Sequence, residues 1–251
     1  MSNITNFLCI QLFSLFLSTA LYSSTLHLFV AVDSNSNLSK GVIADKKNIT
    51  TTFEAIAKLC EMQFKERSIS AKDLSGAAVS RCLEKFDVKS NDVFCFYYSG
   101  HGFRSKIKKC PWPALHFSAT NSLLELASVI SKVKKMKPRF ALILCDSCND
   151  TPMYPRGSFL VGSAPANAVG ARNSAKLKKL FLKTKGIIIS TAAKSGSKAW
   201  SSPRGGIFTN AFLVSLLWEC EKASPSWKSI FVESKQLCKI LQRPEVFIDI
   251  H

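Results

Sequence analysis

Short apolar runs alternate with longer amphipathic segments along most of the chain, and this alternation limits the fold more than any other feature. Strands separated by helices of this length indicate a mostly parallel sheet with helices on both faces. The predicted class is therefore α/β. The predicted strands are Leu26–Val32, Ile69–Lys72, Val93–Tyr98, Phe140–Leu144 and Ile187–Thr191. The predicted helices are about Lys47–Phe64, Gly76–Phe86, Ser122–Lys135, Thr209–Lys222 and Lys228–Leu241.

Two reactive side chains come shortly after predicted strands. His101 stands between glycines in FCFYYSGHGF, and Cys148 follows the apolar run of FALILCDSCND. Flanking glycines free the backbone and leave an imidazole uncovered. Parallel sheets bind ligands beyond the carboxyl ends of their strands, so neighbouring strands would bring thiol and imidazole to one edge. Because only the thiolate attacks a carbonyl well, a histidine there predicts a nucleophile–base pair.

Other interpretations of these residues stay open. A histidine at a strand end is often structural, and a cysteine beside an apolar run is often packed. Cys145 and Cys148 also form a CxxC pair, which suits a redox motif or half of a zinc site. Zinc would need a second pair at suitable spacing, which the sequence lacks. A redox motif expects a strand-to-helix turn, whereas residues 149–157 read as a loop.

Three segments carry a resemblance to a known family: YYSGHGF, LILCDSCND and IIISTAAKSGSKAWSSPRGGIFTNAFL. Together they resemble the caspase-like cysteine peptidases, in particular the metacaspase and bacterial caspase-like branch, from Leu26 to about Phe247. The resemblance implies a caspase–haemoglobinase fold, which is a three-layer sandwich around a mostly parallel sheet, and cysteine endopeptidase activity. It makes Cys148 the nucleophile and His101 the general base and then acid. The backbone N–H groups of Gly102 and Cys148 would form the oxyanion hole.

The sequence departs from that branch at two places. Where the branch continues Cys-His-Ser-Gly, this chain has Cys148-Asn149-Asp150-Thr151. The acidic cluster that some metacaspases use for calcium is replaced by Ala193-Lys194-Ser195-Gly196. Because calcium needs several oxygen ligands, carboxylates in particular, we expect no calcium requirement, no metal site and no cofactor.

Charge predicts the first substrate pocket. Relatives that cut after Arg or Lys place carboxylates there, and Asp45 and Asp146 match those positions, so cleavage after Arg or Lys is expected. Asp45 fits a helix N-cap before Lys46 almost equally well, and Lys40 keeps an aspartate-cutting pocket open as an alternative. Trp200 resembles the wall of the substrate groove, although it could equally belong to the core.

The N-terminal segment has the pattern of a targeting element. The first charged residue is Asp33, and the apolar run Phe7–Leu21 has the length of a signal-peptide h-region. Residues 1–24 are therefore predicted to be a signal peptide or an N-terminal anchor, and residues 25–248 a caspase-like peptidase domain. We expect an exported protein, secreted or periplasmic; a membrane-anchored or cytoplasmic protein is the alternative.

Residues 149–185 are the longest irregular stretch of the sequence. Relatives sometimes cut the corresponding linker during activation, and its length suits a functional or disordered insert, so self-processing within Arg156–Lys185 is predicted. A charged helix that docks Leu177, Leu180 and Phe181 on the core is an equally good interpretation of its basic end.

The chain is strongly basic, with 34 Lys and Arg against 17 Asp and Glu. Its net charge of +17 favours acidic surfaces, anionic membranes or nucleic acid. Basic residues are concentrated between Lys106 and Arg139, where Glu125 is the single acidic residue. This charge keeps a second function open, which is a catalytically inactive caspase-like scaffold acting as a basic binding module. No nucleic-acid motif accompanies them. The expected partners are protein or peptide substrates; a homodimer is left open, and a membrane would be reached only through an uncleaved N-terminal segment.

The nine cysteines follow no regular spacing, so no disulfide framework is predicted. Cys95 and Cys145 lie in apolar runs, where reduced and packed thiols are expected. In an exported protein, five others could form disulfides: Cys60, Cys82, Cys110, Cys220 and Cys238.

Overall fold

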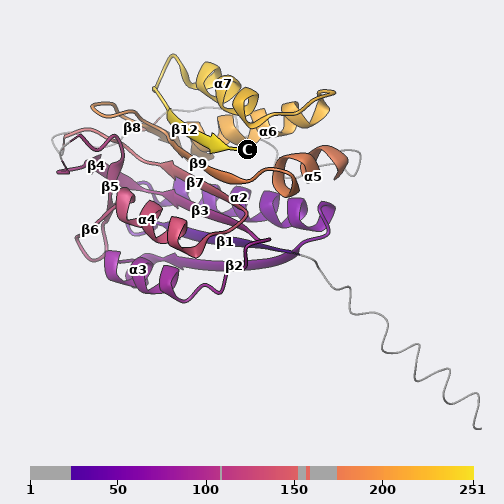
Figure 1. The fold of residues 1–251 in the computed structure, drawn as a ribbon. Coiled ribbons are helices and arrows are strands. Elements are labelled where there is room, and N and C mark those ends of the chain that lie inside the picture. The colour runs from indigo at the N-terminus through magenta and orange to yellow at the C-terminus, as the bar shows by residue number, and fades with distance from the viewer. Residues whose placement is uncertain (1–23, 108, 152–156, 159–173) are drawn as a thin grey trace, which may run out of the picture.

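A six-stranded sheet forms the centre of the computed structural model, which describes residues 24–107, 109–151, 157–158 and 174–251 (Figure 1). Its strands are β1 Thr25–Val32, β2 Gln63–Ser70, β3 Val93–Ser99, β7 Phe140–Asp146, β9 Gly186–Thr191 and β12 Glu245–Ile250. The strand order is β12-β9-β7-β3-β1-β2, and only the pair β12 and β9 is antiparallel. Parallel neighbours need long crossover connections, and helices supply most of them.

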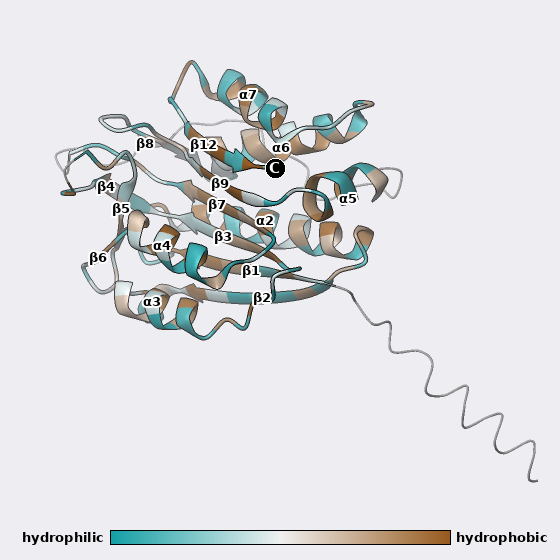
Figure 2. Cartoon of the chain, viewed as in Figure 1, coloured by the Kyte–Doolittle hydropathy of each residue, from teal (hydrophilic) through white to brown (hydrophobic). Residues whose placement is uncertain are grey.

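Helices cover both faces of the sheet and make three layers (Figure 1). They are α2 Ser39–Leu59, α3 Gly76–Glu84, α4 Leu126–Met136, α5 Ser174–Leu182, α6 Ile207–Glu221 and α7 Trp227–Cys238. One face packs against α2, α5, α6 and α7, and the other against α3 and α4. The inner strands β3 and β7 are buried throughout and are therefore strongly apolar (Figure 2). The predicted α/β class, mostly parallel sheet and three-layer sandwich are confirmed.

Two small three-stranded sheets lie beyond the central one. The first contains β4 His101–Arg104, β5 Pro113–Phe117 and β6 Ser122–Glu125. The second contains β8 Gly157–Ser158, β10 Trp200–Ser202 and β11 Gly205–Gly206. Figure 1 shows β4, β5 and β8 together at one end of the central sheet, which is the end where β3 and β7 finish.

The structure differs from the predicted elements mainly at the edges of the sheet. Helix α2 occupies Ser39–Leu59 rather than Lys47–Phe64, and β2 occupies Gln63–Ser70 rather than Ile69–Lys72. An edge strand has one neighbour and faces solvent, so QFKERSIS lacks the apolar run that marks an inner strand. The antiparallel edge strand β12 was not predicted either, although its sequence EVFIDI is rich in apolar residues. Residues 122–125, predicted as helix, form β6, and the helix begins at Leu126.

Two predicted segments fall largely outside the described residues. These are the targeting segment 1–24 and most of the irregular linker 149–185. The basic end of that linker is described, and it forms α5 with Leu177, Leu180 and Phe181 buried in the core. The docked helix is therefore the correct interpretation of that end. Within the part of the chain that the structure describes, no helix is both long and apolar enough to cross a membrane.

Candidate active site

The ends of β3 and β7 bring the predicted histidine and cysteine to one edge of the sheet. The two strands are parallel neighbours, with Ser99 opposite Asp146. The segments that follow these two strands stay side by side beyond the sheet, because Phe103 forms a parallel bridge with Asp150. Both pairs have the same offset of 47 residues. His101 and Cys148 have this offset too, so they occupy matching positions between the two pairs.

Gly102 allows the two chain segments to approach closely. A Cβ atom on this residue would lie 2.6 Å from the carbonyl oxygen of Cys148 and would also overlap the Ser147 hydroxyl. Any side chain at position 102 would therefore push the cysteine loop away. The glycine after His101 therefore allows close packing, in addition to the backbone freedom that the sequence predicts for it.

Replacing Gly102 should show how much this approach contributes to folding. We expect Gly102→Ala to lower the free energy of unfolding by about 3 kcal/mol, because the new methyl group overlaps backbone. The matched control is Gly196→Ala in a neighbouring loop, where the added Cβ meets nothing and only a φ of +78° is strained, at a cost of about 1 kcal/mol. Urea unfolding measures both variants. Equal stability of the two would contradict the close approach.

His101 is oriented by a residue that sequence reasoning missed. Its Nε2 atom lies 2.9 Å from Oδ1 of Asn37, an exposed residue between β1 and α2. Because the amide oxygen is an acceptor, this contact places the ring proton on Nε2 and leaves Nδ1 as the basic nitrogen. The signal that could have found Asn37 is its position just after a strand that neighbours β3, at the same edge of the sheet.

Cys148 lies in the loop after β7 and is 8% exposed. Its Sγ atom is 3.3 Å from the backbone nitrogen of Ala199, which donates to it. The next residue, Asn149, forms an antiparallel bridge with Ser197, so residues 197–199 hold the cysteine loop on one side. An N–H group donated to sulfur favours the thiolate over the thiol.

The other cysteine of the CxxC pair points to the opposite core. Cys145 is fully buried among the residues that face α3 and α4, whereas Cys148 belongs to the core on the other face of the sheet. Opposite faces separate the two sulfurs, and this argues against a redox pair or a shared metal.

The two predicted pocket carboxylates meet behind this edge. Asp45 and Asp146 are both completely buried. The Gly206 N–H donates to Oδ1 of Asp45 at 2.8 Å, while a Cβ atom on Gly206 would overlap Oδ2 of Asp146. Gly206 therefore lies between the two carboxylates. Asp45 is in the interior of α2, which begins at Ser39, so the N-cap interpretation is wrong.

Hydroxyl groups surround both carboxylates. Ser99 Oγ donates to Asp45 at 2.6 Å, and the Thr209 hydroxyl and N–H both donate to Asp146. Because the Thr209 proton is used in this way, the Tyr97 phenol 2.7 Å away must donate to Thr209. Burial raises the pKa of Tyr97 well above its usual range, and the nearby charges of Asp45 and Asp146 raise it further. The phenol therefore stays neutral and keeps donating.

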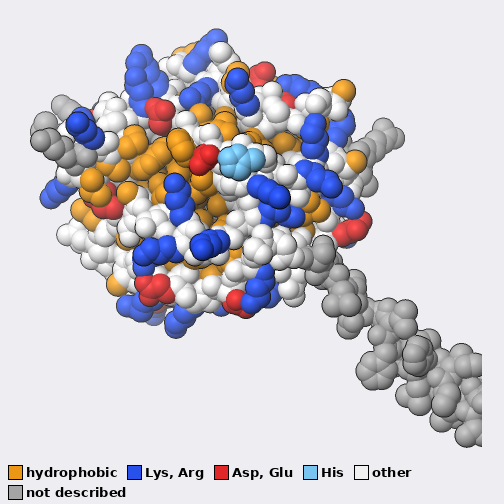
Figure 3. All heavy atoms as spheres, viewed as in Figure 1, with side chains coloured by type: hydrophobic (Ala, Val, Ile, Leu, Met, Phe, Trp, Pro, Cys, Tyr) orange, Lys and Arg blue, Asp and Glu red, His pale blue; other side chains and the backbone are white. Residues whose placement is uncertain are grey.

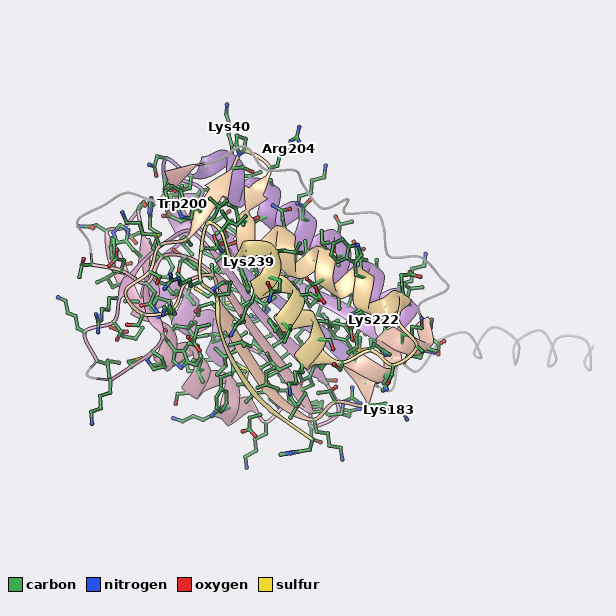
Figure 4. The ribbon with its side chains drawn as sticks, turned by 90° about the horizontal axis from the view of Figure 1, so that it is seen from above. Lys40, Lys183, Trp200, Arg204, Lys222 and Lys239 are labelled. Atoms are coloured by element: carbon green, nitrogen blue, oxygen red, sulfur yellow. The ribbon has the colours of Figure 1, made fainter. Side chains whose placement is uncertain are left out.

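Trp200 and Lys40 lie on the rim of the site. Trp200 opens β10, is half-buried and packs partly against the core, and its place in the wall of a substrate groove stays a prediction. Lys40 is exposed, and Figure 4 shows it pointing outward beside the labelled Arg204. It lines a cavity of about 390 Å³ together with Asn37, Leu38, Ser39, Gly41, Ser201, Ser202 and Pro203.

The five cysteines considered for disulfides are poor nucleophiles or have free thiols in the structure. Burial raises the pKa of Cys60 to about 12, of Cys220 to about 11 and of Cys238 to about 12, so these groups stay protonated at neutral pH. Together with Cys82 and Cys110, they have free thiols in the structure.

An α/β sandwich with a histidine and a cysteine at the carboxyl edge of its parallel sheet belongs to a recognisable class of protein. The family model described as "Caspase domain" matches residues 29–246. The chain therefore belongs to the caspase-domain family, a family of cysteine peptidases, which are hydrolases that act on proteins.

Solved structures support the fold. Caspase-1 from Spodoptera frugiperda has a TM-score of 0.58 and 12% sequence identity, over 90% of this chain and 86% of that one. A protein from Geobacter sulfurreducens has a TM-score of 0.51 and 15% identity, over 89% of this chain and 92% of that one. At such low identity the likeness is one of fold. No curated protein matches the chain.

Proposed function

We propose that this protein is a cysteine endopeptidase in which Cys148 and His101 form the catalytic dyad. The observation that carries the proposal is the shared offset of the β3 and β7 segments, which sets the two residues opposite each other. Membership of the caspase-domain family supports the same roles.

The reaction follows from these positions. His101 Nδ1 takes the thiol proton while Cys148 Sγ bonds to the carbonyl carbon of the substrate. The oxygen becomes negative and is stabilised by the backbone N–H groups of Gly102 and Cys148. The imidazolium then gives its proton to the leaving amine, and a thioester to Cys148 remains. Water, deprotonated by His101, breaks the thioester and restores the thiol. The amide oxygen of Asn37 faces Nε2, so the proton that is exchanged in these steps is carried by Nδ1.

The proposed preference is for Arg or Lys before the cleaved bond. Two carboxylates, Asp45 and Asp146, are gathered around Gly206, and Asp146 comes two residues before Cys148. A basic side chain that entered there would form charge-assisted hydrogen bonds. An acidic one would be repelled in a poorly solvated site. Lys40, which would favour the acidic alternative, points outward (Figure 4). Trp200 is proposed to line the substrate groove.

A thiol-directed activity probe tests the dyad. A peptide ending in Arg and carrying an electrophile should label Cys148 in the native protein, and His101→Ala should reduce the labelling rate at least about 100-fold, because the general base is gone. Cys82→Ala is the matched control, since Cys82 is a half-buried thiol on α3, and it should label normally. Labelling that is equally fast in His101→Ala would refute the dyad.

The same experiment separates the peptidase from the basic binding module. A binding module would show no probe labelling and a salt-dependent retention on nucleic acid. Two cations of the basic stretch already have partners: Lys132 pairs with Glu84, and Lys134 lies over the Phe247 ring. Figure 3 shows Lys and Arg spread around one face with apolar atoms between them, instead of one continuous basic patch. Export, a homodimer and self-processing of the linker stay predictions.

A further inference from the structure

A second cavity lies on the other side of the segment that holds the cysteine loop. Its volume is about 230 Å³, and it is lined by Ser197, Lys198, Lys239, Ile240, Leu241, Gln242 and Arg243. Lys198 belongs to the loop before β10, and Lys239 to Arg243 follow α7 (Figure 4 labels Lys239). Three of these seven residues are cationic and none of them is acidic. The volume is several times the ~30 Å³ that one water molecule occupies in the liquid.

Gln242, one of the residues that line this cavity, carries a buried donor. The residue is 4% exposed, and its Oε1 atom accepts a hydrogen bond from the Trp200 N–H at 3.0 Å. This contact fixes which end of the amide is oxygen. The Nε2 atom at the other end is buried and donates to no atom of the described residues. A buried donor without an acceptor costs about 1–3 kcal/mol, so such a group marks a place where an acceptor is missing.

We propose that this cavity binds a phosphate-class oxyanion. The oxyanion would accept a hydrogen bond from Gln242 Nε2 and would be paired with Lys239 and Arg243. Arg243 offers a planar fork that matches two oxygens of a phosphate, and Lys239 adds positive charge without geometric demands. Two cations favour a multiply charged phosphate over a single carboxylate.

The cavity is connected to the candidate active site through backbone. Gln242 holds the N–H of Trp200, and the preceding residue, Ala199, donates its N–H to Cys148 Sγ. The proposed anion would therefore bind one side chain away from the segment that contacts the nucleophile. The binding claim itself does not depend on peptidase activity.

Calorimetric titration of the full chain with sodium pyrophosphate tests the proposal, at constant ionic strength set with sodium chloride. Lys239→Gln and Arg243→Gln should each weaken binding about 10-fold or more, because each removes a charge-assisted contact. Gln242→Glu should abolish binding, since glutamate keeps an oxygen for the Trp200 N–H and places a negative charge where the donor was. Lys183→Gln is the matched control; Lys183 is exposed and lies far from Lys239 in Figure 4, and its removal should leave the affinity unchanged.

Three results would overturn the proposal. The first is the absence of pyrophosphate binding at millimolar concentration. The second is an equal loss of affinity in Lys183→Gln, Lys239→Gln and Arg243→Gln, which would mean attraction by net charge alone. The third is binding of a dicarboxylate such as glutarate as tightly as pyrophosphate, which would assign the site to acidic side chains of peptides. If Gln242→Glu fails to fold by thermal unfolding, the two cation variants decide the test.

Discussion

Cys148→Ala is expected to abolish peptide cleavage, with a fall in kcat/KM of at least about 10⁴-fold, because the atom that bonds to the substrate is removed. The fold should survive. Replacing sulfur by hydrogen at this site removes two weak contacts with Ala199, one from its N–H and one to its carbonyl oxygen, so the free energy of unfolding should change by about 1 kcal/mol. Cleavage of a fluorogenic peptide and urea unfolding give the two measurements.

The control for this variant is Cys82→Ala, which removes a thiol on the opposite side of the sheet, in α3. Its cleavage rate should equal that of the native protein. Retained turnover in Cys148→Ala would exclude this residue as the nucleophile, and equal loss in both variants would point to a general effect of cysteine removal.

Asp146→Asn is expected to lower kcat/KM for a peptide with Arg before the cleaved bond about 10²- to 10³-fold. Removing one charge of a buried ion pair leaves the other charge unpaired and costs about 3–5 kcal/mol. The asparagine oxygen can still accept from the N–H and hydroxyl of Thr209, so the local fold should be preserved. The matched variant is Asp45→Asn, which changes the second carboxylate beside Gly206.

Three peptides that differ only in Arg, Lys or Asp at that position measure the preference. A native preference for Asp would refute the pocket assignment. So would an Arg preference that neither Asp146→Asn nor Asp45→Asn alters. The net charge of +17 opposes the approach of basic peptides, but this long-range term is screened beyond roughly 8 Å at physiological salt. The local carboxylates should therefore control the choice.

The sequence by itself determined the inner part of the fold and the identity of the candidate dyad. The inner strands β1, β3, β7 and β9 are covered on both faces, so each must be an apolar run that can be read directly. His101 and Cys148 each come two residues after one of these strands. Because parallel strands finish at the same edge, the topology class alone implied that the two side chains lie near each other.

Only the tertiary structure decided the features that depend on contacts between distant segments. The edge strands β2 and β12 are partly exposed, and β2 carries little apolar signal. Asp45 accepts hydrogen bonds from Ser99 and Gly206 in the interior, because α2 begins at Ser39 and packs on the sheet. The local sequence around Asp45 does not distinguish this buried role from that of a helix cap. The hydrogen bonds of Asn37 with His101 and of Gln242 with Trp200 also depend on the tertiary structure. Each joins residues that are far apart in the sequence, and no local sequence pattern predicts such a contact.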